Sequence, residues 1–232
     1  MKAMILAAGR GERLRPWTDR QPKPLVEIAG QPLIAHHLRA LAAAGFCEVV
    51  INVAYRGDQI VAALGTGQRY GVTITYSHET PGALDTGGGV ARALPLLGEG
   101  PFALISSDVV TDFDYRCLPR QLGADLGHFV LVANPAHHRD GDFGLRDGRI
   151  VETGPRSTYA GIAVFSAEAF ATQADSRFPL SAVMHAARAA GRASGQHHAG
   201  RWLDVGRPAS LARARQAGAP RGDVCESGGS RC

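Results

Sequence analysis

The chain has 232 residues, of which 45% are hydrophobic and 20% are charged, and its formal net charge is +4. This composition excludes an intrinsically disordered chain, and no apolar run approaches the roughly 18 residues that a membrane-spanning helix needs. From Gly206 onward there are five arginines against two acidic residues, so the rest of the chain is nearly neutral and predicts no basic face for nucleic acid. The N-terminal apolar stretch is too short for a secretory signal, and we expect a cytoplasmic protein that binds neither nucleic acid nor membranes.

Short apolar runs rich in β-branched residues alternate with helical patterns as far as Val132. The apolar runs predict buried strands at Ala3–Ala7, Glu48–Val53, Val72–Tyr76, Phe102–Ser106 and Phe129–Val132. The intervening patterns predict helices at Leu33–Ala44, Asp58–Leu64 and Gly88–Leu97. Pro95 should shorten or bend the last of these helices. Such alternation predicts an α/β fold in which helices cover both faces of a mostly parallel sheet.

The pattern changes after Asn134, where shorter elements follow one another. Gly148 stands in a turn signal between two short apolar runs, which is typical of a hairpin. The elements predicted here are strands at Asp142–Leu145, Arg149–Glu152, Tyr159–Phe165 and Trp202–Val205, and helices at Leu180–Ala190 and Pro208–Gln216. Residues 217–232 are polar and rich in Gly and Ser, so we expect one domain over residues 1–216 and a disordered tail.

A glycine-containing loop follows the first predicted strand. In the sequence LAAGRGER, Gly9 and Gly11 stand where this strand ends. Glycine lets backbone N–H groups approach an anion closely, and this edge of a parallel sheet is where phosphates bind. A dinucleotide fingerprint would need a third glycine in place of Leu14, and a P-loop would need a Gly-Lys-Ser or Gly-Lys-Thr sequence. The loop alone is equally compatible with a turn that has no function.

Three cations, Arg13, Arg15 and Lys23, follow this loop in a stretch that contains three prolines. The prolines prevent regular structure and stiffen the chain. A stiff cationic loop beside a glycine turn suits a triphosphate. Lys23 is one of only two lysines in the chain, and lysine provides a compact point charge where the fork of arginine does not fit. A solvated basic loop is the alternative.

The stretch LAAGRGERLRPWTDRQPKP resembles the signature of the sugar-1-phosphate nucleotidyltransferases, L-A-A-G-x-G-x-R-x-x-P-x-T followed by P-K-P. The resemblance implies a single Rossmann-like nucleotidyltransferase domain with a mixed, mostly parallel sheet. It also implies that Gly9, Gly11, Glu12 and Arg13 surround the nucleotide phosphates. Lys23 would bridge these phosphates and the incoming sugar phosphate.

Two aspartates stand where a magnesium ion would be expected. Nucleotidyl transfer normally uses Mg²⁺, which binds one or two carboxylates together with waters and phosphates. Asp108 follows a predicted strand at the carboxyl edge of the sheet, and Asp204 is an acidic residue in the apolar run WLDVG. ISSDVVTD and WLDVG also resemble the segments that supply the metal-binding aspartates in the family. A helix cap at Asp108 and a salt bridge at Asp204 are the alternatives.

The resemblance assigns further residues to the base and the sugar. Gly82 and the segment LDTGGG, which contains Gly87 and Gly88, correspond to the part of the family that flanks the base and closes on the sugar. Glycines at a helix start cost about 1 kcal/mol each, which close approach to a ligand would explain, whereas a flexible connection is the alternative. Asp142 and Glu152 could accept hydrogen bonds from sugar hydroxyls, unless the hairpin is merely solvated.

Two positions depart from the family pattern. Ser106 belongs to the predicted nucleotide site, but relatives often carry asparagine there, two residues before Asp108. Thr153 follows Glu152, where many relatives carry a lysine. A phosphate contact from that lysine must therefore come from another residue.

At a closer level, VANPAHHRDGDF, LDTGGG and GRWLDVG resemble one branch of the family, the uridylyltransferases that act on N-acetylmuramate 1-phosphate in cell-wall recycling. We therefore expect an Mg²⁺-dependent enzyme that makes a UDP-sugar and pyrophosphate from UTP and a sugar 1-phosphate. A muramate pocket needs a cation for the lactyl carboxylate, or an opening to water. The predicted hairpin region offers Arg139 foremost, and also Arg146, Arg149 and Arg156.

Other functions stay open at this point. The nearest alternatives are guanylyl- or thymidylyltransferases that act on mannose, heptose or glucose 1-phosphate. Outside enzymes, a nucleotide-sugar sensor would keep the glycine loop but could dispense with the two aspartates. The oligomeric state is not predicted.

Overall fold

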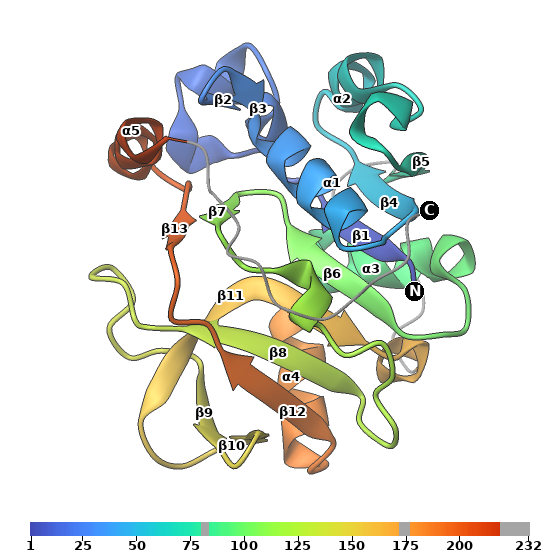
Figure 1. The fold of residues 1–232 in the computed structure, drawn as a ribbon, viewed down its shortest axis with the longest axis vertical. Helices are drawn as coiled ribbons and strands as arrows, with labels where there is room; N and C mark the ends of the chain where they lie inside the picture. Colours follow the sequence, from blue (N-terminus) through green and yellow to red (C-terminus); the bar gives the residue numbers. More distant parts are fainter. Residues whose placement is uncertain (80–83, 172–176, 219–232) are drawn as a thin grey trace.

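A nine-stranded sheet forms the centre of the computed structural model, which describes residues 1–79, 84–171 and 177–218 (Figure 1). From one edge to the other the strands are β5 (Thr73–His78), β4 (Glu48–Val53), β1 (Ala3–Leu6), β6 (Phe102–Ser106), β11 (Arg156–Phe165), β8 (Gly127–Val132), β12 (Ala193–His197), β10 (Arg149–Val151) and β9 (Phe143–Arg146). The first four are parallel neighbours, and all of them except the edge strand β5 are largely buried. Strands β11 and β10 run against the other seven, so the predicted mostly parallel, mixed sheet is confirmed.

Helices cover both faces of the sheet, as predicted. Alternate residues of β1 point to opposite faces, so that Ile5 and Met4 belong to different hydrophobic cores. The core with Ile5 includes side chains of α1 (Leu33–Ala43) and α2 (Gly57–Leu64). The core with Met4 includes those of α3 (Asp85–Leu97) and α4 (Leu180–Ala189).

A third, smaller core joins the N-terminal loops to the end of the domain. It contains Leu14, Val110, Val205 and Leu211, all nearly inaccessible to solvent. The elements around it are the short pairs β2 (Glu27–Ile28) with β3 (Gln31–Pro32) and β7 (Val109–Thr111) with β13 (Trp202–Asp204), together with α5 (Pro208–Ala217). This core therefore holds the N-terminal loops and helix α5 beside the segment that follows β6.

The start of α3 and several strands differ from the sequence-based expectation, in which β2, β3 and β7 were also absent. Helix α3 begins at Asp85 rather than Gly88, because the carbonyl of Phe178 accepts hydrogen bonds from the N–H groups of Gly87 and Gly88 in its first turn. Pro95 lies inside this helix, which still ends at Leu97 as predicted. Strand β12 was not predicted, since its sequence ASGQH lacks β-branched residues.

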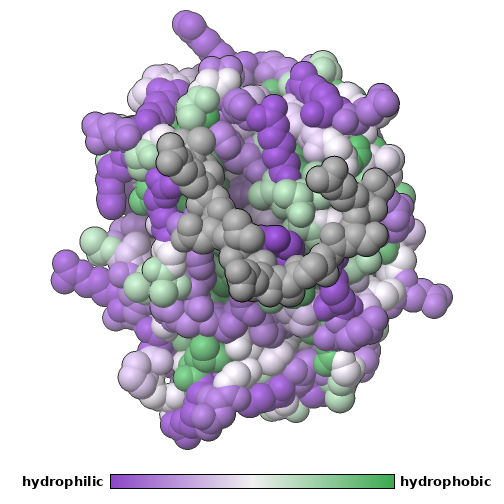
Figure 2. Space-filling model, in the orientation of Figure 1, coloured by the Kyte–Doolittle hydropathy of each residue, from purple (hydrophilic) through white to green (hydrophobic). Residues whose placement is uncertain are grey.

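Helix length and surface hydropathy were compared with what a membrane-spanning segment requires. No helix in the described ranges is long and apolar enough to cross a bilayer. Figure 2 shows that the face in view is largely hydrophilic, with small and scattered hydrophobic areas. The predicted disordered tail falls almost entirely outside the described residues.

Candidate active site

A cleft of about 540 Å³ lies at the carboxyl ends of the parallel strands. Its lining includes the last residue of β1, Leu6, and the last residue of β6, Ser106. Asn52 near the end of β4 and Glu79 just after β5 also line it. Ligands bind at this edge of open α/β sheets because the loops that follow the strands converge there.

The glycine loop and Lys23 pack directly against each other at this cleft. Gly11 has a φ of +67°, and its carbonyl accepts a hydrogen bond of 2.9 Å from the Thr18 hydroxyl. A Cβ at Gly11 would lie 3.1 Å from Cβ of Lys23, so a side chain here would push Lys23 away. At Gly9, by contrast, an added Cβ would meet nothing within 4 Å, which leaves this part of the loop open.

Lys23 and Asp108 form an ion pair inside the cleft. Lys23 Nζ lies 2.7 Å from Asp108 Oδ2, and the Lys23 side chain is only 11% exposed. Burial raises the pKa of the Asp108 carboxyl, but the Lys23 ammonium outweighs burial and leaves that pKa below its ordinary value. Asp108 is therefore ionised at neutral pH and can share its charge with a second cation.

The β7–β13 pair brings the second predicted aspartate beside the first. Asp204 pairs in register with Val109, and the N–H of Val205 donates a 2.8 Å hydrogen bond to the carbonyl of Asp108. A Cβ at Gly206 would lie 2.8 Å from Asp204 Oδ1 and 3.4 Å from Nη2 of Arg13. Glycine at 206 thus leaves room for both Asp204 and Arg13, and the lining of the cleft includes Arg13 and Gly206 but not Asp204.

These residues fit a magnesium ion. Asp108 and Asp204 stand on backbone segments that are hydrogen-bonded to each other, and Asp108 lines a cleft large enough for a polyphosphate. Mg²⁺ is usually bound by one or two carboxylates plus substrate phosphates and waters, and not by a complete protein cage. The described residues accordingly contain no group of three or more potential metal ligands.

Sequence reasoning missed two polar residues of the cleft, Asn52 and Glu79. Asn52 Oδ1 accepts a hydrogen bond from the N–H of Ala7, while Asn52 Nδ2 donates to Glu79 Oε1 at 2.6 Å. The other carboxylate oxygen of Glu79 accepts from the N–H of Leu84, and Glu79 is only 3% exposed. The available signal was their position, because Asn52 lies near the end of β4 and Glu79 just after β5, both at the carboxyl edge of the sheet.

The predicted nucleotide residues are mostly brought together, but the glycines of α3 are not. The lining of the cleft contains Gly9, Gly11, Glu12, Arg13, Lys23, Ser106 and Asp108. Gly87 and Gly88 are absent from the lining, whereas their helix neighbours Asp85 and Thr86 are part of it. A Cβ at Gly87 would collide with the ring of Phe178, so this glycine serves packing within the protein. Gly82 lies outside the described residues.

The predicted sugar residues Asp142 and Glu152 also lie outside the lining of the cleft. Asp142 accepts a hydrogen bond from the N–H of Tyr159 and lies 3.0 Å from His138 Nε2. Glu152 forms ion pairs with Arg156 and Arg188. Both carboxylates thus have partners within the protein, and a contact of either with a sugar stays a prediction.

The four arginines considered for a lactyl carboxylate do not line the cleft either. Arg149 makes two hydrogen bonds to the carboxylate of Asp125, at 2.7 and 2.9 Å. Arg139 Nε donates to the backbone carbonyl of Ala136. The arginine that does line the cleft, besides Arg13, is Arg177, which the sequence analysis did not single out.

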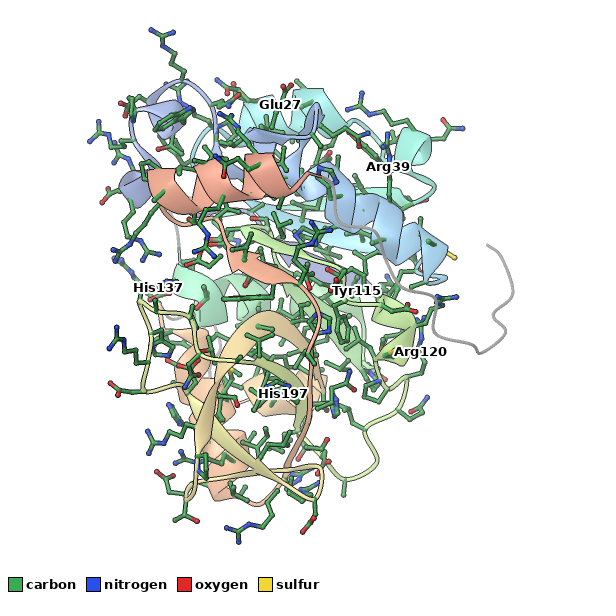
Figure 3. All side chains as sticks on the ribbon, turned by 60° about the vertical axis from the view of Figure 1, so that its left-hand side comes forward. Glu27, Arg39, Tyr115, Arg120, His137 and His197 are labelled. Carbon is green, nitrogen blue, oxygen red and sulfur yellow. The ribbon has the colours of Figure 1, made fainter. Side chains whose placement is uncertain are left out.

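A further contact that was not expected from the sequence joins His137 to Asp204. His137 Nε2 lies 3.5 Å from Asp204 Oδ2. His137 comes from the loop between β8 and β9, and Figure 3 shows it at the level where the upper and lower halves of the molecule meet. The doubled histidines therefore provide a neighbour for a carboxylate, and the described residues contain no histidine-based metal cluster.

Comparison with known proteins agrees with this geometry. The profile of the nucleotidyl transferase family matches residues 2–147. An N-acetylmuramate alpha-1-phosphate uridylyltransferase of Neisseria meningitidis is 48% identical over 227 residues, which cover 93% of this chain and 97% of that protein. A protein of the same name from Caulobacter vibrioides is 35% identical over 89% of this chain and 92% of its own length.

More distant relatives share the first half of the chain or the fold alone. The catalytic subunit beta of a mannose-1-phosphate guanylyltransferase from Drosophila melanogaster is 42% identical over 120 residues, 50% of this chain and 32% of that protein. The crystal structure of a Bacillus anthracis protein described as a glucose-1-phosphate thymidylyltransferase superposes with a TM-score of 0.83 at 24% identity, covering 94% of both chains.

Proposed function

Because the chain belongs to the nucleotidyl transferase family, we propose that it transfers the uridylyl group of UTP to N-acetylmuramate α-1-phosphate and releases pyrophosphate. The reaction class is supported by Arg13, Lys23 and Asp108, which line one cleft, and by Asp204, which lies beside the lining residue Gly206. The substrates follow from the two relatives that match nearly the whole chain. We propose the cytoplasm as the place of action, since UTP is available there.

The reaction needs no covalent intermediate with the protein. A phosphate oxygen of the sugar 1-phosphate attacks the α-phosphorus of UTP, and the bond from that phosphorus to the bridging oxygen of the β-phosphate breaks. Pyrophosphate leaves with the electron pair of the broken bond. Both reactants are anions that repel each other, so catalysis consists of positioning them and stabilising the charge on the phosphates.

Arg13 and Lys23 supply this stabilisation in the proposal. The Lys23 ammonium has three N–H donors, so its bond to Asp108 leaves two for phosphate oxygens. Its low exposure strengthens these contacts, because water screens them less. Mg²⁺ held by Asp108 and Asp204 would neutralise further phosphate charge and hold the two reacting phosphates together.

Glu79 and Asn52 are suited to the edge of the base. Two lone-pair positions of the Glu79 carboxylate are taken by Asn52 and Leu84, which leaves others to accept the N3–H of uracil. Guanine presents two neighbouring N–H donors that could also satisfy a carboxylate. GTP is therefore the most informative competitor of UTP in the assay below.

The test is a pyrophosphate-release assay with UTP, dTTP, GTP and CTP against several sugar 1-phosphates, with the product identified by mass. We expect the highest kcat/KM with UTP and N-acetylmuramate 1-phosphate in the presence of Mg²⁺. A clear preference for another pair would correct the substrates and leave nucleotidyl transfer in place. Nucleotide-sugar binding without release of pyrophosphate for any pair would instead indicate the sensor.

A further inference from the structure

A short segment that begins at Arg177 is attached firmly to the first turn of α3. The carbonyl of Phe178 accepts hydrogen bonds of 3.0 and 3.2 Å from the N–H groups of Gly87 and Gly88. The N–H of Leu180 donates to the Thr86 hydroxyl at 2.9 Å. The Phe178 ring fills the space where a Cβ of Gly87 would stand. We call these contacts the α3 seam; they determine where the neighbouring Arg177 can lie.

Arg177 lines the cleft together with Asp85 and Thr86. Asp85 adopts a φ of +65°, and its carboxylate accepts the N–H of Thr86 at 2.6 Å. A left-handed backbone at a residue other than glycine is strained, and such residues cluster at functional sites. Among the described residues, no carboxylate forms an ion pair with Arg177. The side chain of Arg177 is exposed, so with respect to the described residues it is available to an anion in the cleft.

The other two cations of the lining lie with the candidate metal residues. Lys23 is paired with Asp108, and Arg13 shares the surroundings of Gly206 with Asp204. Arg177 comes from a different part of the chain, next to α4. An acceptor sugar that carries a carboxylate in addition to its phosphate brings one more negative charge than Arg13, Lys23 and the metal are placed to meet. Without a partner, that carboxylate would be costly to remove from water.

We propose that Arg177 is a specificity-determining residue that binds the lactyl carboxylate of the acceptor sugar, an inference that rests on the proposed function. The planar guanidinium matches a carboxylate with two parallel N–H···O bonds. The α3 seam holds Arg177 in place without using its side chain. Recognition of the acceptor thus depends on packing between α3 and the start of α4, whereas the phosphates are bound by the N-terminal loops.

The experiment compares two acceptors that differ only in the lactyl ether, N-acetylmuramate 1-phosphate and N-acetylglucosamine 1-phosphate, with UTP saturating. In the wild-type enzyme we expect the muramate to be preferred. Arg177→Ala should lower kcat/KM for the muramate about 10- to 100-fold, which is the range for a charged hydrogen bond, and change it less than about 3-fold for the glucosamine. The loss should appear mainly in KM of the acceptor, and Arg177→Lys should restore part of it.

Two controls test whether the effect depends on the charge of the lactyl group and on the position of the arginine. The methyl ester of the lactyl group keeps the shape but not the charge, and the Arg177→Ala variant should no longer distinguish the ester from the acid. Arg139→Ala, at an arginine outside the cleft lining, should leave the preference unchanged.

Three outcomes would overturn the assignment. An equal loss for both acceptors would place Arg177 on the sugar phosphate, and a higher KM for UTP would place it on the nucleotide. An unchanged preference in Arg177→Ala would show that the carboxylate is met elsewhere or by water. If the wild-type enzyme uses neither acceptor, the proposed function itself fails and the assignment of Arg177 fails with it.

Discussion

The two sides of the cleft are built in different ways. The phosphate side consists of the glycine loop, Lys23, Asp108 and the segment around Asp204, joined by backbone hydrogen bonds and close contacts at Gly11 and Gly206. The proposed acceptor side consists of Asp85, Thr86 and Arg177, whose positions depend on the α3 seam. The groups proposed for nucleotidyl transfer thus lie in the N-terminal loops and at strand ends, whereas those proposed to select a sugar are positioned by packing between helices.

The largest expected effect concerns the two aspartates of the phosphate side. Asp204→Asn or Asp108→Asn should lower kcat by about 1,000-fold or more, because each change removes charge from the proposed cation site. Asp204→Asn is the cleaner probe, since Asp108→Asn also leaves the nearly buried Lys23 without its charged partner. Turnover is measured over a range of Mg²⁺ concentrations, with Asp58→Asn on the exposed start of α2 as the control. Near wild-type rates in both variants would exclude this cation site.

Lys23 tests the preorganised charge of the same side. Lys23→Ala should lower kcat/KM by an amount equal to about 2–4 kcal/mol, as expected for the loss of one fixed electrostatic contact. Lys23→Arg should restore little, because the wider guanidinium has to fit beside Gly11, where Lys23 is closely packed. Lys2→Ala is the matched control, since Lys2 lies at the start of β1 and pairs with Glu48. Full activity of Lys23→Arg would show that any positively charged side chain is sufficient at this position.

The buried His37 makes the stability of the fold depend on pH. It lies in α1, 3% exposed, with Nδ1 2.8 Å from the hydroxyl of Tyr115, which Figure 3 labels. Burial lowers the pKa of His37 to about 4, so the unfolded chain takes up a proton near pH 6.5 while the folded chain does not. Stability should therefore fall by up to about 3 kcal/mol as the pH drops from 6.5 to about 4.

Urea unfolding at several pH values checks this prediction. The variant His37→Asn should lose this part of the pH dependence, whereas His36→Asn, at a less buried neighbour on the same helix, should keep it. An identical pH profile for the wild type and His37→Asn would assign the acid sensitivity to other groups.

The smallest effect expected tests the α3 seam. Gly87→Ala places a methyl group against the ring of Phe178 and 2.9 Å from its carbonyl oxygen, so it should destabilise the fold by about 1–3 kcal/mol. Gly100→Ala, where an added Cβ meets nothing within 4 Å, is the control. Urea unfolding measures both. Equal stability of the two variants would show that the packing of Phe178 on α3 adapts freely.

Sequence alone determined the phosphate side of the cleft. The glycines, Arg13 and Lys23 lie within a stretch of the chain short enough for the local backbone to bring them together, so their spacing was sufficient to predict a common site. Asp108 could be predicted too, because a buried parallel strand delivers the residue after it to one known edge of the sheet. The fold class followed from the alternation of apolar runs and helical patterns, because that alternation reflects burial of strands on both faces.

The acceptor side was decided only by tertiary structure. The sequence could not show that Phe178, about ninety residues later, packs against Gly87 and accepts hydrogen bonds from the N–H groups of Gly87 and Gly88. Asp142 and Glu152 looked available because their partners Tyr159 and Arg188 belong to other strands and helices. Arg177 carried no local signal at all, since its position comes from hydrogen bonds between two distant segments, and such contacts depend on the folded arrangement and not on neighbouring residues.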